Sequence, residues 1–127
     1  MLGQPVRDIQ ENNNETLFYN STSKTRSDQI IIEGGVVVMI KKMISYGDPE
    51  KISDINNVYG LSKYSLYGPD SEGGNKLYVY PDNGIAYIGK PQFDTLEEIW
   101  HFVPMSIKDF REKWAPNYSD TPILNLY

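Results

Sequence analysis

The most informative segment of the chain reads Lys76-Leu77-Tyr78-Val79-Tyr80-Pro81-Asp82-Asn83-Gly84-Ile85-Ala86-Tyr87-Ile88. Two runs rich in leucine, tyrosine, valine and isoleucine flank a Pro-Asp-Asn-Gly turn. Side chains that carry bulk close to the backbone suit a pleated strand. Asparagine and glycine tolerate the positive φ that a tight hairpin requires. The segment therefore predicts a β-hairpin.

An earlier segment has the same organisation. Gln29–Ile32 and Val36–Ile40 flank the turn sequence Glu33-Gly34-Gly35. Two apolar runs on either side of a glycine pair predict a second hairpin. Because these two strands are continuously apolar, we expect both of their faces to be covered.

The two hairpins belong to a longer internal repeat. A Gly-x-Pro element and an aromatic strand precede each hairpin, at Gly3–Pro5 and Leu17–Asn20 in the first copy and at Gly47–Pro49 and Ser65–Gly68 in the second. A repeat period of about 45 residues is typical of a repeated supersecondary unit. The sequence therefore predicts one domain over residues 1–127. It comprises repeat 1 over residues 2–42, repeat 2 over residues 46–90 and a C-terminal strand and helix extension over residues 91–127.

Helices are expected at two places. Asp48 suits an N-cap, Pro49 the first helical position and Gly60 the end of a short helix. Ser106–Trp114 predicts a second helix, with Ser106 as its cap and an apolar stripe formed by Ile107, Phe110 and Trp114. Pro5–Ile9 is compatible with one helical turn.

The run Glu98–Val103 favours a strand because it is aromatic and β-branched. Thr95 and Glu98 are also spaced as a capping box, so a helix over 97–103 is the alternative. Taken together, these elements predict an α+β fold. It is an antiparallel sheet built from two repeated strand-plus-hairpin units, with the C-terminal helix packed on one face.

The repeated pattern resembles the outer-membrane-assembly lipoproteins of the SmpA/OmlA type and the β-lactamase-inhibitor-protein-like fold that shares their unit. The matching segments are Leu2–Pro5, Leu17–Tyr19 and Ile30–Ile40 in one copy, and Tyr46–Pro49, Leu66-Tyr67 and Leu77–Ile88 in the other. The resemblance implies a non-catalytic accessory or inhibitor of the bacterial cell envelope or secreted fraction. It implies a sheet face presented to another protein, no catalytic residues, and a targeting segment that this chain lacks.

Composition limits the classes of partner. The formal net charge is −5, so neither nucleic acid nor an anionic membrane is an electrostatically favoured partner. The chain has no cysteine, which excludes a disulfide framework, a thiol nucleophile and a cysteine-based zinc site. No apolar run approaches the roughly 20 residues that a helical membrane span needs. We expect no cofactor, and we expect another protein as partner, with a homodimer as a further possibility.

Tyrosines form the candidate binding surface. The chain contains 10 of them, and tyrosine combines a large contact area with a polar end, as protein recognition requires. On a strand, Tyr78 and Tyr80 point to one face, opposite Leu77 and Val79. The alternative is that these rings only cover the edge of the core. The candidate binding residues are Tyr64, Tyr67, Tyr78, Tyr80 and Tyr87.

Other chemistry has weaker support. His101 is the sole histidine, and catalysis would need an orienting carboxylate such as Asp94, Glu97 or Glu98. Its apolar neighbours favour a packed strand residue instead. Oxygen side chains at Asp70, Glu72 and Asn75 lack the spacing of an EF-hand calcium loop. Asp48, Glu50 and Asp54 complement a helix dipole.

Three functions follow in order of preference. The first is a non-catalytic protein-binding or accessory module, extracytoplasmic in location. The second is a cytosolic interaction or immunity-type protein. The third is a small hydrolase that uses His101.

Overall fold

A computed structural model describes residues 3–23, 26–45, 47–68 and 76–121. Most of them lie in strands. The elements in chain order are β1 (Arg7–Glu11), β2 (Asn14–Tyr19), β3 (Asp28–Glu33), β4 (Val36–Met43), α1 (Ile52–Tyr59), β5 (Tyr64–Tyr67), β6 (Lys76–Tyr80), the 3₁₀ turn η1 (Pro81–Asn83), β7 (Ile85–Lys90), the 3₁₀ turn η2 (Pro91–Phe93), β8 (Thr95–Phe102) and α2 (Ile107–Lys113).

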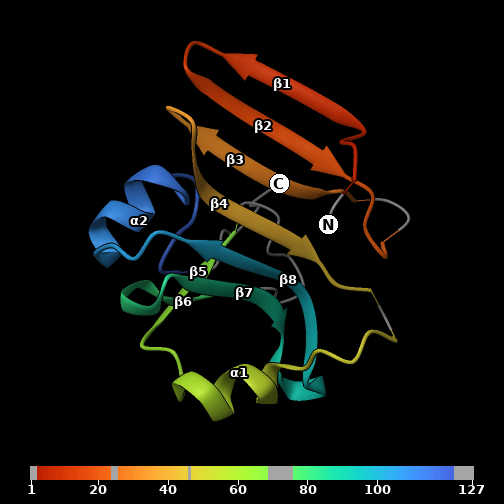
Figure 1. Cartoon of the computed structure of the whole chain (residues 1–127). Helices are drawn as coiled ribbons and strands as arrows, with labels where there is room; N and C mark the ends of the chain where they lie inside the picture. The colour runs from red at the N-terminus through yellow and green to blue at the C-terminus, as the bar shows by residue number, and fades with distance from the viewer. Residues whose placement is uncertain (1–2, 24–25, 46, 69–75, 122–127) are drawn as a thin grey trace, which may run out of the picture.

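The strands form one antiparallel sheet in the order β1-β2-β3-β4-β8-β7-β6-β5. Each half is a meander of four consecutive strands. The halves meet where β4 pairs with β8, with Met39 opposite Phe102 and Met43 opposite Glu98. This junction places two strands that are far apart in sequence at the centre of the sheet (Figure 1).

The hairpin of β6 and β7 is observed where the sequence predicts it, with Tyr78 opposite Tyr87. Its connection is a 3₁₀ turn that ends at Gly84, which has a φ of 66°. A side chain at Gly84 would collide with the backbone carbonyl oxygen of Phe102. Only glycine combines this left-handed backbone with so close an approach.

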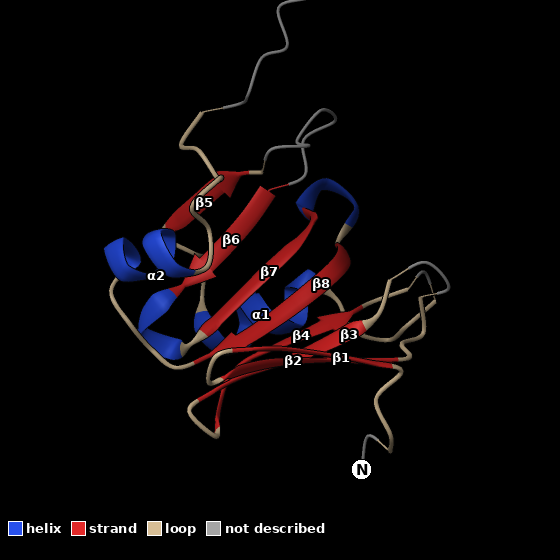
Figure 2. Ribbon diagram, turned by 90° about the horizontal axis from the view of Figure 1, so that it is seen from above, coloured by secondary structure: helices blue, strands red, loops and turns tan. Residues whose placement is uncertain are grey.

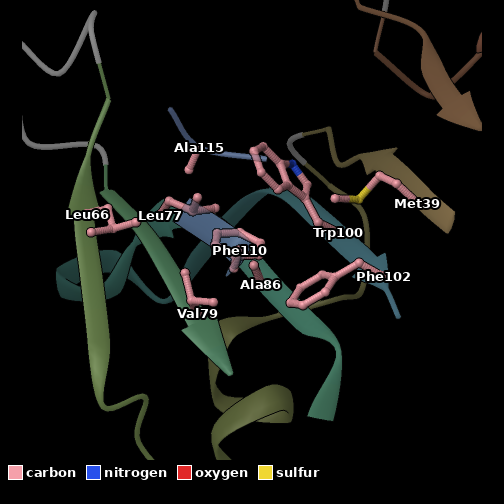
Figure 3. Close-up of a cluster of buried hydrophobic side chains, with 9 residues drawn as sticks. All are labelled: Met39, Leu66, Leu77, Val79, Ala86, Trp100, Phe102, Phe110 and Ala115. Atoms are coloured by element: carbon pink, nitrogen blue, oxygen red, sulfur yellow. The ribbon is translucent and has the colours of Figure 1, made fainter. Parts of the chain in front are cut away.

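The two helices cover opposite faces of the β5–β8 half. Trp100 and Phe102 of β8 pack with Phe110 of α2 in one buried layer, and Figure 3 shows Phe110 at its centre. Ile99 points to the other face and packs with Ile52 of α1 in a second layer. Alternate residues of β8 thus enter different layers, as the two-residue period of a strand requires.

The β1–β3 part of the sheet has no helix over it among the described elements. Figure 2 shows these strands running at a marked angle to those of the β5–β8 half, so the sheet is strongly twisted. Val36 and Val37 of β4 are 60% and 48% exposed. Met39 and Ile31 do pack in the layer that contains Phe110 of α2. The expectation that both faces of the 29–40 hairpin are covered is nevertheless wrong, because Val36 and Val37 remain exposed.

The predicted division into two repeated strand-plus-hairpin units is wrong as well. Residues 2–42 and 46–90 do not form separate copies, because the described strands belong to one sheet. The first half contributes only Met39 and Ile31 to the layer around Phe110, whereas the second contains two 3₁₀ turns and packs a helix on each face. The shared apolar hairpins reflect common β-sheet composition. The sheet is also covered by α1 on the face opposite to α2, whereas the prediction placed only the C-terminal helix on it.

Several local predictions can be compared directly. Residues 98–102 are strand, within β8. Ser106 caps α2 by accepting a hydrogen bond from the Asp109 amide. Pro5–Ile9 forms no helical turn, since β1 begins at Arg7 and pairs with β2. Asp48 is not a helix cap, because α1 begins at Ile52.

Phe110→Ala should lower the free energy of unfolding by about 3–5 kcal/mol, because it removes the ring at the centre of a buried layer. Lys108→Ala on the exposed side of the same helix is the matched control and should change stability by less than about 0.5 kcal/mol. Urea unfolding followed by circular dichroism measures both. A loss below about 1 kcal/mol for Phe110→Ala would show that α2 does not close the layer.

Candidate functional site

A hollow of about 470 Å³ lies at the end of the sheet where α1 finishes and α2 begins. Four segments line it. They are the end of α1 with the following loop (Tyr59, Leu61), the start of β5 (Lys63, Tyr64), the end of β6 with η1 (Val79, Tyr80, Pro81, Asp82, Asn83) and the start of α2 (Ser106, Ile107).

Tyr80 fixes one wall of the hollow. Its hydroxyl donates to the backbone carbonyl of Gly60 at 2.8 Å and lies 3.0 Å from the side-chain oxygen of Asn56. The ring of Tyr59 packs on the Tyr80 ring with a centroid distance of 5.8 Å. These contacts hold the end of α1 against the end of β6.

Backbone hydrogen bonds fix the opposite wall. The amide of Met105 donates to the carbonyl of Pro81 at 3.1 Å, and the amide of Phe102 donates to the carbonyl of Gly84 at 2.9 Å. Both link the segment before α2 to η1. Ser106 then begins the helix as its cap. The walls are therefore preformed by the same contacts that build the fold.

The rim of the hollow exposes large apolar side chains. Leu61 is 82% exposed, Tyr59 41% and Tyr64 39%. Val58, one residue before Tyr59, is 71% exposed. Single exposed apolar residues are ordinary on protein surfaces, but several around one concavity indicate a contact surface. Lys63 and Asp82 add opposite charges to the lining.

The five candidate tyrosines do not form one exposed face. Tyr64 is exposed at the hollow, whereas Tyr80 and Tyr87 are buried in the α1-side layer at 6% and 3% exposure. Tyr78 stacks on Tyr87 at 4.8 Å between ring centroids. Tyr67 is half-buried at the β5 edge, with the Lys76 ammonium 4.7 Å from its ring centroid. The structure thus brings only Tyr64 and Tyr80 to the hollow.

The buried tyrosines have altered acidity. Burial, and then the neighbouring Tyr80 and Tyr78, raise the pKa of Tyr87. Burial also raises the pKa of Tyr78 and of Tyr80. Desolvation disfavours the phenolate anion, so all three remain neutral well into the alkaline range.

His101 lies elsewhere, on β8 opposite Ile40 of β4 and Ile85 of β7. Partial burial, and then the charge of Lys42, lower the pKa of His101. The acids considered as its partners have other roles.

Asp94 accepts hydrogen bonds from the backbone amide and the hydroxyl of Ser53, at 2.8 and 2.7 Å. Glu98 lies three residues before His101 on β8. Because side chains alternate between the faces of a strand, it points to the opposite face of the sheet. There it accepts from Trp100 Nε1 and Arg26. No described interaction joins Glu97 to the imidazole, so no carboxylate orients His101 within the described residues.

The remaining acidic candidates form no cation site among residues that the structure describes. Asp48 accepts hydrogen bonds from the Ser45 amide at 2.8 Å and the Thr22 hydroxyl at 2.7 Å. Glu50 pairs with Lys42, and Asp54 accepts from the Lys51 amide at the start of α1. Asp70, Glu72 and Asn75 lie outside the described residues. Neither described helix is long and apolar enough to cross a membrane.

Sequence reasoning missed Leu61, Tyr59 and Lys63 as lining residues. Leu61 follows the predicted helix-ending Gly60, and an apolar residue directly after a helix end was the available signal. The segments that complete the hollow, at Pro81 and Ser106, come from distant parts of the chain. Their convergence depends on the fold.

Comparisons of the chain with known protein families, with curated proteins and with solved structures find no match. The resemblance to outer-membrane-assembly lipoproteins thus stays a prediction.

The raised tyrosine pKa values predict a specific alkaline response. Unfolded tyrosine loses its proton near pH 10, while the buried side chains keep theirs. Stability from these groups is therefore complete below about pH 10 and is lost as pH rises above it. Urea midpoints at several pH values should fall less steeply between about pH 9 and 11 for Tyr87→Phe than for the wild type. Equal slopes for Tyr87→Phe and the wild type would contradict the account.

Proposed function

We propose that this chain is a non-catalytic protein-binding module whose hollow receives an apolar side chain of a partner protein. The observation that carries the proposal is the exposure of Leu61, Tyr59 and Tyr64 around one concavity of about 470 Å³. Burial of such side chains provides most of the free energy of association in protein interfaces, with aromatic residues prominent among the strongest contributors.

Two features favour recognition over incidental exposure. Tyr59 is held by the ring of Tyr80, whose hydroxyl is itself hydrogen-bonded to the end of α1. A rigid aromatic wall loses little conformational entropy on binding. Lys63 and Asp82 supply charges of both signs beside the apolar surface. In an apolar binding site, a few polar groups mainly fix the orientation of the ligand, while the apolar contacts provide most of the affinity.

The cellular setting of this role follows from the resemblance alone. An accessory protein of the cell envelope or secreted fraction is the preferred form, and a cytosolic interaction or immunity-type protein is the alternative. Either would use the same hollow. We do not extend the proposal to a hydrolase, because His101 is not among the residues that line the hollow.

Selection of a random peptide library displayed on phage against the purified chain tests the proposal. We expect enriched peptides to share a bulky apolar residue. Leu61→Asp should weaken their binding about tenfold or more, because the charge would be desolvated at the contact.

Phe93→Asp provides the matched control. Phe93 is 71% exposed on η2, at the opposite end of β7 from the hollow. This variant should bind the selected peptides as the wild type does. Failure to enrich any peptide, or equal binding by Leu61→Asp and the wild type, would contradict a binding role for the hollow.

A further inference from the structure

The two outer edges of the sheet differ, because one residue of β5 has a backbone partner beyond it, whereas no described residue pairs with the outer side of β1. At the β5 edge, Tyr67 and Ser119 exchange two backbone hydrogen bonds, at 2.7 and 2.8 Å. At the other edge, β1 pairs only with β2 among the described strands, and all five of its residues are exposed. An open strand edge carries unpaired amide and carbonyl groups that can accept another strand.

The register of β1 and β2 identifies the unpaired groups. Glu11 lies opposite Asn14 across a two-residue turn, in which Asn12 has a φ of 55°. The pair that flanks such a turn is hydrogen-bonded, and hydrogen-bonded pairs alternate along an antiparallel ladder. Arg7, Ile9 and Glu11 therefore direct their backbone groups to β2. Asp8 and Gln10 direct theirs outward.

We propose that β1 pairs with β1 of a second copy of this chain, antiparallel and with a two-fold axis at Ile9. The backbone amide and carbonyl of Asp8 then exchange hydrogen bonds with those of the partner's Gln10. The symmetry-related pair, Gln10 and the partner's Asp8, forms the same two bonds. Arg7 lies opposite the partner's Glu11, and Ile9 lies opposite the partner's Ile9. Such an interface is isologous, the commonest symmetry of soluble oligomers.

The order of side chains in Arg7–Glu11 selects this register. A shift by two residues towards the N-terminus would place Asp8 opposite the partner's Asp8. The shift in the other direction would leave Ile9 opposite a carboxylate of the partner. A parallel arrangement would oppose Arg7, Asp8 and Glu11 with identical charges. Like charges directly opposite each other destabilise a strand pair, whereas opposite charges stabilise it.

The exposed charges on β1 therefore act selectively. Charged side chains protect an edge against unspecific strand addition, and here their order still permits the self-complementary pairing. Ile9 is 37% exposed and lies opposite Thr16 of β2, which in turn lies opposite Ile31 of β3. Pairing at the axis would cover this apolar end and join two sheets into one. The hollow beside α1 lies near the opposite edge, so this proposal is independent of the binding role.

A single introduced cysteine tests the register directly, because the chain has none of its own. Ile9→Cys would place two thiols in a non-hydrogen-bonded pair, where the Cα atoms lie about 4.5 Å apart, within the range of a disulfide. Mild oxidation of the full chain should convert Ile9→Cys to a covalent dimer. Asp8→Cys is the control and should remain monomeric under denaturing conditions.

Charge reversal provides a second measurement by sedimentation velocity over a range of concentrations. We expect the wild type to dimerise. Arg7→Glu and Glu11→Arg should each raise the dimer dissociation constant about tenfold, since each change affects two symmetric pairs. The double variant, with both residues exchanged, should restore the wild-type value. Lys108→Glu on α2 is the control for net charge and should have no effect.

Each outcome decides the proposal. Cross-linking of Ile9→Cys together with recovery in the double variant supports it. Cross-linking of Asp8→Cys instead, a wild type that stays monomeric up to about 1 mM, or a double variant no better than the single ones would overturn it.

Discussion

The structure depends on the pairing of β4 with β8. Every other strand pairing joins strands that are consecutive in the sequence. Among the strand pairings, only the ladder from Met39–Phe102 to Met43–Glu98 joins the two halves. It brings Met39 into the buried layer beneath Phe110. Without this pairing, β8 would be an edge strand with apolar side chains on both faces.

This junction also explains why the two halves of the sheet differ in how much of their surface the helices bury. Both helices follow or precede strands of the second meander, and each packs on the face to which its connection leads. The result is a half with two buried layers and a half whose valines remain exposed. Ion pairs such as Lys113–Glu33 join α2 to the uncovered half. Exposed pairs of this kind contribute little to stability. Apart from Met39 and Ile31, which pack in the buried layer, the first meander is therefore held mainly by its own strand pairing.

Local features were predictable from sequence, and nonlocal ones were not. The Pro-Asp-Asn-Gly turn fixed the β6–β7 hairpin, and Ser106 fixed the start of α2, because both signals act within a few residues. The apolar run of 29–40 suggested burial, but the cover it needed is absent from that half. Tyr64 and Tyr80 are the same residue type on neighbouring strands. Their exposure differs because α1 packs on one face, which spacing along the chain does not reveal.

Amide hydrogen exchange measured by NMR at low protein concentration tests the central claim most directly. If the β4–β8 junction and the two helices carry the stability, the amides of β7 and β8 should exchange only through global unfolding. Those of β2 should open with a smaller free energy, because little apolar surface is buried there. Equal protection of β2 and β8 would contradict the account, since it would mean that the uncovered meander is as stable as the half enclosed by both helices.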